Sequence, residues 1–271
     1  MNRYIRCWAA ALEALGLAFE ILDQKQNCLR TIIADKPYLF YDQALPFVMP
    51  SISRIAVSKD LTYDLLHPKI KMPQLRYYID FDVEETYQEQ VEFRSYAAII
   101  ADIEKHFNYP IFVSANRTQK KVKANLCADA ISLEAELKRL FDQKNPDYYP
   151  LTVVEEYLEP VANYMLLFFQ NQLLYCIQDQ DSFVDEKAEQ AIVELTDKAL
   201  VAKLLSLVSP LLPIINSDFI GFRVSEDASG VLYLQSLVAD LASGILGQEN
   251  SSPLLTSISK KIISAILVAE N

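Results

Sequence analysis

Apolar residues recur at helical spacing near both ends of the sequence. The segment RCWAAALEALGL, residues 6–17, places apolar side chains three and four positions apart, and it contains Gly16, a residue typical of a helix end. Near the other end, Ser252 suits an N-cap and Pro253 suits the first helical position. One apolar stripe follows: Leu255, Ile258, Ile262 and Ile266. These patterns predict a helix at each end.

Strand-like patterns occupy much of the remaining chain. Short β-type runs separated by polar turns predict hairpins or strands in residues 18–42, 109–127, 151–158, 164–178 and 218–237. We expect the hairpin at 109–127 and the strands at 151–178 to form one layer. This layer should have Lys59 and the segment 155–158 facing a shared cleft.

Helical patterns lie between these strands, and one segment reads as an extended linker. We expect helices in residues 53–66, ended by Pro68, in 87–107, in 132–143 and in two segments within 183–209. The segment KMPQLRYYIDF, residues 71–81, reads as the linker. Because helices and strands mix without regular βαβ alternation, the sequence predicts an α+β fold.

Composition narrows the class of protein. With 51% hydrophobic residues in 271, the chain can bury a large core, and its formal charge of −11 disfavours a nucleic-acid partner. The four cysteines are far apart and fit neither a zinc site nor a disulfide framework. No run of eighteen uninterrupted apolar residues occurs, and the N-terminus lacks a cleavage site. We therefore expect a cytoplasmic protein without a membrane partner.

Glycine is scarce, and this excludes several nucleotide-binding motifs. The chain has only 5 glycines, whereas average usage predicts about nineteen. No GxGxxG, Walker loop or GxSxG motif is present. The hairpin at 109–127 has no glycine in its turn, but it carries the one basic cluster, RTQKKVK. If this hairpin covers phosphates, we expect long side chains to replace the backbone N–H groups.

Four segments together resemble the ATP-grasp family, in the branch of carboxylate–amine and carboxylate–thiol ligases that includes D-alanine–D-alanine ligases. In order, they are SKDLTYDLLHPKIKMP, YPIFVSANRTQKKVKAN, LTVVEEYL and ASGVLYLQSLVADLASGI. The resemblance covers nearly the whole chain. It implies a small N-terminal α/β domain in residues 1–74, followed by an ATP-grasp domain in 75–271. That second domain would contain a lid at roughly 95–158 and a C-terminal α+β subdomain.

The same resemblance implies which residues would bind ATP. Lys59 occupies the position of one phosphate-binding lysine, but Ser114 occupies the position of the second. Phosphate contacts would then come from Lys59 and from Arg117 or Lys120 of the hairpin. The adenine hinge would be formed by Val154, Glu155, Glu156, Tyr157 and Leu158.

The resemblance fails at the metal site. Gln235 and Leu237 stand where the family has a metal-binding carboxylate and an asparagine. A neutral amide cannot replace a carboxylate that bridges two divalent cations. A shift of two or three residues in the alignment would instead bring Glu226 or Asp227 into a metal-binding role.

Two functional hypotheses follow. In the first, the fold persists without magnesium-dependent ligation, as in a pseudoenzyme. The chain is then a nucleotide- or peptide-binding module or the non-catalytic partner of an active ligase. In the second, the chain is an active ATP- and Mg-dependent ligase that forms an amide bond through an acylphosphate, with relocated metal ligands.

Overall fold

The computed structural model describes residues 1–116, 124–145, 148–179, 193–241, 246 and 251–269. Contacts divide the chain into two compact units, which are described separately. Unit 1 comprises Met1–Ser53, Ala162–Ser225 and Leu237–Asn271, and unit 2 comprises Arg54–Val161 and Glu226–Ser236. The domain boundary expected between residues 74 and 75 stays a prediction.

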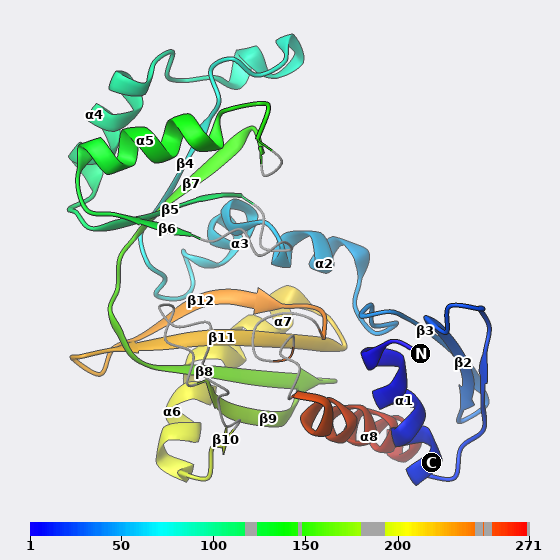
Figure 1. The fold of residues 1–271 in the computed structure, drawn as a ribbon. Coiled ribbons are helices and arrows are strands. Elements are labelled where there is room, and N and C mark those ends of the chain that lie inside the picture. Colours follow the sequence, from blue (N-terminus) through cyan, green and yellow to red (C-terminus); the bar gives the residue numbers. More distant parts are fainter. Residues whose placement is uncertain (117–123, 146–147, 180–192, 242–245, 247–250, 270–271) are drawn as a thin grey trace. The chain divides into compact units, whose positions relative to one another are not determined.

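Unit 1 contains the terminal helices and two antiparallel sheets, except that residues 226–236, which carry the turn between the last two strands and most of the last strand, are grouped with unit 2 (Figure 1). A three-stranded sheet has the order β1-β2-β3, with bounds Phe19–Ile21, Cys28–Ile33 and Lys36–Tyr41. A five-stranded sheet has the order β10-β9-β8-β11-β12. Its bounds in chain order are β8 Pro160–Phe169, β9 Gln172–Asp179, β10 Val193–Glu194, β11 Phe219–Asp227 and β12 Leu232–Val238. The helical elements are α1 Arg3–Ala14, α6 Lys198–Val208, η2 Ser209–Leu211, α7 Leu212–Ile215 and α8 Ser252–Ala269.

The core of unit 1 joins both ends of the chain. The helices α1 and α8 lie side by side (Figure 1), and Trp8 of α1 stacks on Phe40 of β3 with ring centroids 4.2 Å apart. All four residues of the apolar stripe expected in α8 are buried in this core. The terminal helices and the hairpins at 18–42 are therefore confirmed.

Unit 2 has a four-stranded antiparallel sheet, and two of its helices pack on one face of that sheet. Its sheet has the order β4-β7-β5-β6. The strands are β4 Leu75–Ile79, β5 Ile111–Ala115, β6 Asn125–Cys127 and β7 Leu151–Glu156. The helical elements are α3 Lys59–Leu66, η1 Glu85–Gln90, α4 Tyr96–His106 and α5 Ala130–Leu140, and α2 Pro50–Ala56 joins the two units along the chain. Side chains of α4 and α5 share a buried core with Ile111, Val113 and Val154.

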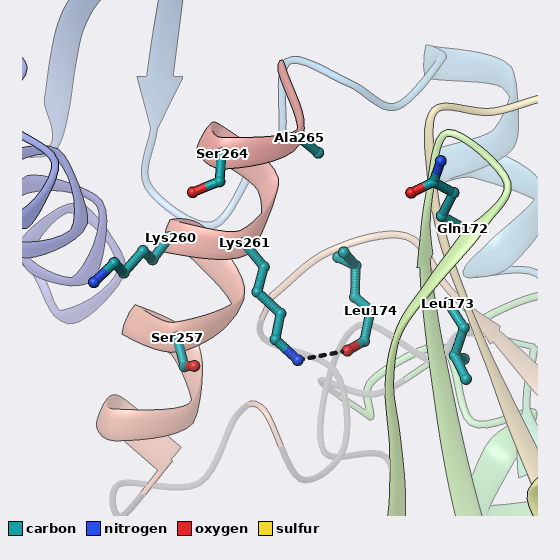
Figure 2. Close-up of a pocket in the computed structure, with 8 residues that line it drawn as sticks. All are labelled: Gln172, Leu173, Leu174, Ser257, Lys260, Lys261, Ser264 and Ala265. Carbon is teal, nitrogen blue, oxygen red and sulfur yellow. Dashed lines mark hydrogen bonds between the residues drawn. The ribbon is translucent and has the colours of Figure 1, made fainter. Parts of the chain in front are cut away.

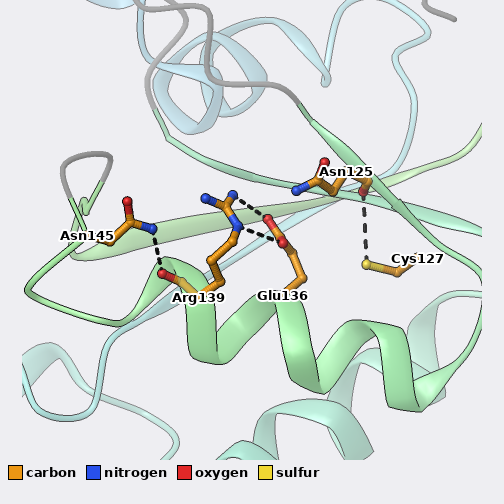
Figure 3. Close-up of polar contacts among 5 residues, drawn as sticks. All are labelled: Asn125, Cys127, Glu136, Arg139 and Asn145. Atoms are coloured by element: carbon orange, nitrogen blue, oxygen red, sulfur yellow. Dashed lines mark hydrogen bonds and ion pairs between the residues drawn. The ribbon is translucent and has the colours of Figure 1, made fainter.

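Polar contacts support α5 at this core. Arg139 donates to the carboxylate of Glu136 from Nε at 2.9 Å and from Nη2 at 2.6 Å (Figure 3). Asn145 donates to the backbone oxygen of Arg139 at 2.8 Å, and the Cys127 thiol lies 4.0 Å from the backbone oxygen of Asn125. Because Glu136 is 8% exposed, its pairing with Arg139 compensates a carboxylate that is largely removed from water.

Several expectations about elements were wrong. Residues 53–66 form two helices rather than one, because Ser58 adopts an extended backbone before α3. The expected linker contains β4, which pairs along its length with β7. The helix expected over 87–107 begins only at Tyr96, where the Ser95 side chain accepts the backbone N–H of Ala98.

The expected single layer is also wrong. The hairpin strands β5 and β6 share a sheet with β7, whereas β8 and β9 belong to the five-stranded sheet. Met165, Leu167 and Phe169 of β8 enter the core of unit 1, which explains the change of sheet after β7. Of the helices expected within 183–209, α6 is described, and residues 183–192 lie outside the described residues.

Two helical segments, Lys198–Ile215 and Ser252–Ala269, are long and apolar enough to cross a membrane by length and composition alone. Core helices pass the same criterion, and α8 places its apolar stripe in the core of unit 1.

Candidate functional site

The start of α3 is fixed by a side chain from the end of β5. Asn116 Oδ1 accepts the backbone N–H groups of Lys59 at 2.9 Å and Asp60 at 3.3 Å. Its amide nitrogen donates to the Asp60 carboxylate at 2.6 Å and to the Ser58 hydroxyl at 3.3 Å. Asn116 thus supplies the N-cap contacts that the Ser58 side chain does not make.

Lys59, the first residue of α3, forms an ion pair with Glu155 of β7. The two side chains are 24% and 14% exposed. Lys59 therefore lies next to the segment 155–158, as expected, whereas the shared cleft expected there stays a prediction. The contact also means that the ammonium already has a partner of opposite charge.

Glu155 lies on the sheet face opposite α4 and α5. The register pairs Glu155 with Phe112 and Val153 with Ser114, so these four side chains share one face. The Phe112 ring packs edge-on against Tyr157, with centroids 5.2 Å apart. This face therefore has an aromatic part beside the ion pair.

Ser114 is a small buried side chain at the position where the resemblance places a second lysine. It is 3% exposed, and its hydroxyl has no hydrogen-bond partner among the described residues. Because a serine hydroxyl is neutral, this position provides no positive charge for a phosphate.

Of the other hinge residues, Val154 and Glu156 lie in β7, and Tyr157 and Leu158 follow this strand. Val154 is fully buried in the core beneath α4 and α5, so its side chain lies on the face opposite Glu155. Glu156 is exposed, and its carboxylate accepts the backbone N–H of Gln74 at 3.2 Å. Tyr157 and Leu158 are half-buried, and within the described chain no hydrogen bond engages the backbone of either residue.

Arg117 and Lys120 lie outside the described residues. Their expected role at the hairpin therefore remains a prediction.

The residues considered for a metal site lie on β11, β12 and their connecting turn. Asp227 accepts the backbone N–H groups of Ser229 and Val231, each at 2.9 Å, and the Ser229 hydroxyl at 2.7 Å. These bonds, led by the Ser229 hydroxyl, lower the pKa of the Asp227 carboxyl. Asp227 therefore closes the turn between the strands. Gln235 is half-buried and Leu237 is 4% exposed in β12.

In the part of the chain that the structure describes, no group of three or more His, Cys, Asp or Glu residues could hold a metal ion. Glu226, the other alternative ligand, precedes Asp227 in β11. Neither residue belongs to a described acidic cluster.

A shallow pocket of about 440 Å³ occurs in unit 1, between α8 and the start of β9 (Figure 2). It is lined by Gln172, Leu173, Leu174, Ser257, Lys260, Lys261, Ser264 and Ala265. Lys261 donates to the backbone oxygen of Leu174 at 2.9 Å and lies 3.5 Å from the Tyr175 ring centroid. None of the residues selected from the sequence lines this pocket.

Sequence reasoning missed Asn116 as the residue that organises the site. Its signal was present, because Asn116 directly follows a predicted strand in the motif YPIFVSANRTQKKVKAN. The contact itself joins residues 57 positions apart in the chain, a separation at which no local pattern operates.

Comparisons with known proteins bear on the fold. No family model matches the chain, and no curated protein matches it. Among solved structures, the ATP-grasp ligase PsnB complexed with a minimal precursor is similar over 83% of this chain, with TM-score 0.55 and 13% identity. D-alanine–D-alanine ligase from Bacillus anthracis, complexed with ATP, matches 80% of this chain with TM-score 0.53 and 13% identity. A RimK domain ATP-grasp protein from Sphaerobacter thermophilus matches 79% with TM-score 0.54 and 14% identity.

The chain spans 64% of the PsnB chain, 66% of the B. anthracis ligase and 69% of the S. thermophilus protein. At these identities the likeness shows the fold, which is the α+β fold of ATP-grasp ligases. The fold expected from the sequence is therefore confirmed.

Proposed function

We propose that this chain is a non-catalytic protein on the ATP-grasp fold that binds a nucleotide weakly and with little dependence on magnesium. The observation that carries the proposal is the ion pair between Lys59 and Glu155, formed on the same sheet face as the buried Ser114. Phosphoryl transfer to a carboxylate gathers negative charge that cations must neutralise. The described part of unit 2 offers at this place one lysine that is already paired, with Asp60 as its neighbour.

The residues at the expected metal site also argue against magnesium binding. Leu237 is buried and apolar, Gln235 carries no charge, and Asp227 is engaged by three hydrogen bonds in its turn. Divalent cations need charged oxygen ligands to bind between phosphates. This donor set favours a protein that does not hold two magnesium ions.

Adenine binding needs less of the site than catalysis does. An adenine ring hydrogen-bonds to backbone groups and packs on apolar or aromatic side chains. Tyr157 and Leu158 offer backbone groups without partners in the described chain, and Phe112 and Tyr157 offer aromatic surface. These groups support retention of a nucleotide after loss of the ligase chemistry.

The rival candidate is an active ligase. It is favoured by one observation, the position of Lys59 beside the hinge strand, where the family resemblance requires a phosphate-binding lysine. In that candidate, ATP would displace Glu155 from Lys59, and relocated carboxylates would hold magnesium. Binding of ATP would then depend strongly on magnesium.

Calorimetric titration of the full chain with ATP, with and without magnesium, distinguishes these candidates. We expect weak binding that changes less than about threefold on adding magnesium, a difference below ~1 kcal/mol. Lys59→Ala should weaken binding, whereas Lys69→Ala, an exposed lysine in the loop after α3, should not. A gain of a hundredfold or more from magnesium would support the ligase instead. Absence of heat in both titrations would mean that the chain binds no ATP and serves only as a scaffold.

A further inference from the structure

The three-stranded sheet of unit 1 has two apolar faces rather than one. Its register places the row Phe19, Thr31 and Tyr38 toward α1 and α8, and it places the next row, Glu20, Arg30 and Leu39, on the opposite face. Since side chains alternate along each strand, this outer face comprises Glu20, Leu22, Cys28, Arg30, Ile32, Pro37, Leu39 and Tyr41.

Most of the outer face is apolar and reaches water. Ile32 is 63% exposed, Tyr41 60%, Leu39 52% and Leu22 44%. Antiparallel sheets that face solvent ordinarily carry polar residues there. Four large side chains at such exposure make a patch on the order of 400 Å², within the range of about 300–600 Å² in which a protein's largest patches are often functional.

The edge of the sheet is less suited to a partner than its face. Both β1 and β3 are edge strands, since each pairs only with β2 in this sheet. The first, β1, has only 3 residues. The second, β3, begins with Lys36 and contains Pro37, which has no backbone N–H to donate to an added strand. A partner would therefore pack on the side chains of the outer face rather than extend the sheet.

Charge on the outer face selects the kind of partner. Glu20 and Arg30 form an ion pair at 2.6 Å and stay 57% and 59% exposed. The outer face thus has one anion and one cation side by side, on a chain whose formal charge is −11. A strongly basic or acidic partner would find no excess charge here. A second copy, related by a two-fold axis that runs between Glu20 and Arg30, would place Arg30 of each copy against Glu20 of the other.

We propose that this outer face packs against the same face of a second copy of the chain. Two patches of this size would bury roughly 800 Å² in total, which lies at the weak and transient end of interface sizes. The dimer should therefore form and dissociate with concentration. This inference is independent of the nucleotide proposal, because it concerns a separate sheet in unit 1.

Sedimentation equilibrium of the full chain, from about 1 μM to about 1 mM, tests the dimer over the affinity range of weak complexes. We expect the wild-type mass to rise toward that of a dimer. Leu39→Lys should abolish the rise. The matched control is Ile131→Lys on α5, which changes charge equally at a site that is 81% exposed and should leave dimerisation unchanged. Thermal melting of each variant confirms that it is folded.

A charge-reversal pair identifies the partner as a second copy. Arg30→Glu gives a face with two carboxylates, and Glu20→Arg gives a face with two guanidinium groups, so each variant alone should be monomeric. An equimolar mixture should form a heterodimer at least about tenfold tighter than either variant's own dimer, a gain of ~1.4 kcal/mol.

The proposal is overturned if the wild-type chain stays monomeric at the highest concentration. It is also overturned if Leu39→Lys leaves a dimer intact, or if the charge variants fail to associate when mixed. If the wild-type chain stays monomeric, the outer face would instead be a site for a different protein.

Discussion

The Lys59 ammonium in unit 2 already has a carboxylate partner, Glu155. The pair with Glu155 is only 24% and 14% exposed, so water screens it less than it screens a surface pair. A bound phosphate would have to compete with that carboxylate. The positive charge of Lys59 is therefore already neutralised by Glu155.

Neutralising Glu155 should release that charge. We expect Glu155→Gln to raise the affinity for ATP by about three- to tenfold, which corresponds to roughly 0.6–1.4 kcal/mol. Glu156→Gln is the matched control, because it removes the same charge from the adjacent exposed residue and should change affinity less than twofold. Titration calorimetry measures both. An unchanged or lower affinity for Glu155→Gln would mean that Lys59 does not reach the phosphates.

Residue patterns predicted the neighbourhood of Lys59 and Glu155, but they could not predict the ion pair. Motif order along the chain carries information on which segments meet. It carries none on whether a lysine will be paired in the absence of ligand. The N-cap role of Asn116 was hidden for a similar reason, since the residues it contacts are 56–58 positions away.

At the scale of elements, the errors arose where pairing is non-local. β4 looked like a linker because its run is short and follows Pro73, yet the residues of β7 with which it pairs lie 72–80 positions further along the chain. The helical pattern before Tyr96 did not form a continuous helix, because Ser95 caps α4 at that point. In contrast, α8 was predicted well, since its stripe and its first residues are local signals.

Gly221 in β11 lies where the neighbouring side chains leave no room for a Cβ atom, and its backbone does not need the conformational freedom of glycine. A Cβ at this position would lie 2.8 Å from Leu167 Cδ2 and 2.9 Å from Val238 Cβ. We expect Gly221→Ala to lower the free energy of unfolding by about 1–3 kcal/mol, as overpacking does in well-packed cores.

A double-mutant cycle locates this cost. In a Leu167→Ala background the nearest atom is gone, so Gly221→Ala should cost less there than in the wild-type chain. Urea denaturation measures all four proteins. A cost below about 0.5 kcal/mol for the single variant would show that the strands separate without strain.

At the scale of the whole molecule, the ATP-grasp fold was predictable because its four motifs occur in order along the chain. The packing of the compact units was not, since unit 1 is assembled from three separate stretches. The contact of α1 with α8 joins the two ends of the sequence, which no local pattern could reveal.

Two buried thiols and two half-buried phenols should make the folded chain sensitive to alkali. Burial raises the pKa of Cys127 and of Cys176 from 9.0 to about 11, with smaller contributions from Glu136 and Asp129 on Cys127 and from Glu194 on Cys176. Burial, followed by neighbouring carboxylates, raises the pKa of Tyr109 and Tyr148 to about 12. Unfolding would release these groups to ionise at their ordinary values.

Because these pKa values are raised by folding, their stabilising effect is complete below the unfolded values and is lost as pH rises through the folded ones. We expect the melting temperature to fall steadily between about pH 9 and pH 12, in line with the cited shifts. Cys176→Ala should flatten the part of this fall between about pH 9 and pH 11, whatever its effect at neutral pH. A melting temperature constant over the whole range would contradict the burial of these groups.

The central claim is that this chain has the fold of the ligases without their phosphoryl chemistry. Single-turnover release of phosphate from ATP, with the chain in excess and with magnesium and amino acids present, tests it most directly. The account predicts no release above that of ATP in buffer, for the wild-type chain and for Lys59→Ala alike. Release of phosphate by the wild-type chain that Lys59→Ala abolishes would contradict it.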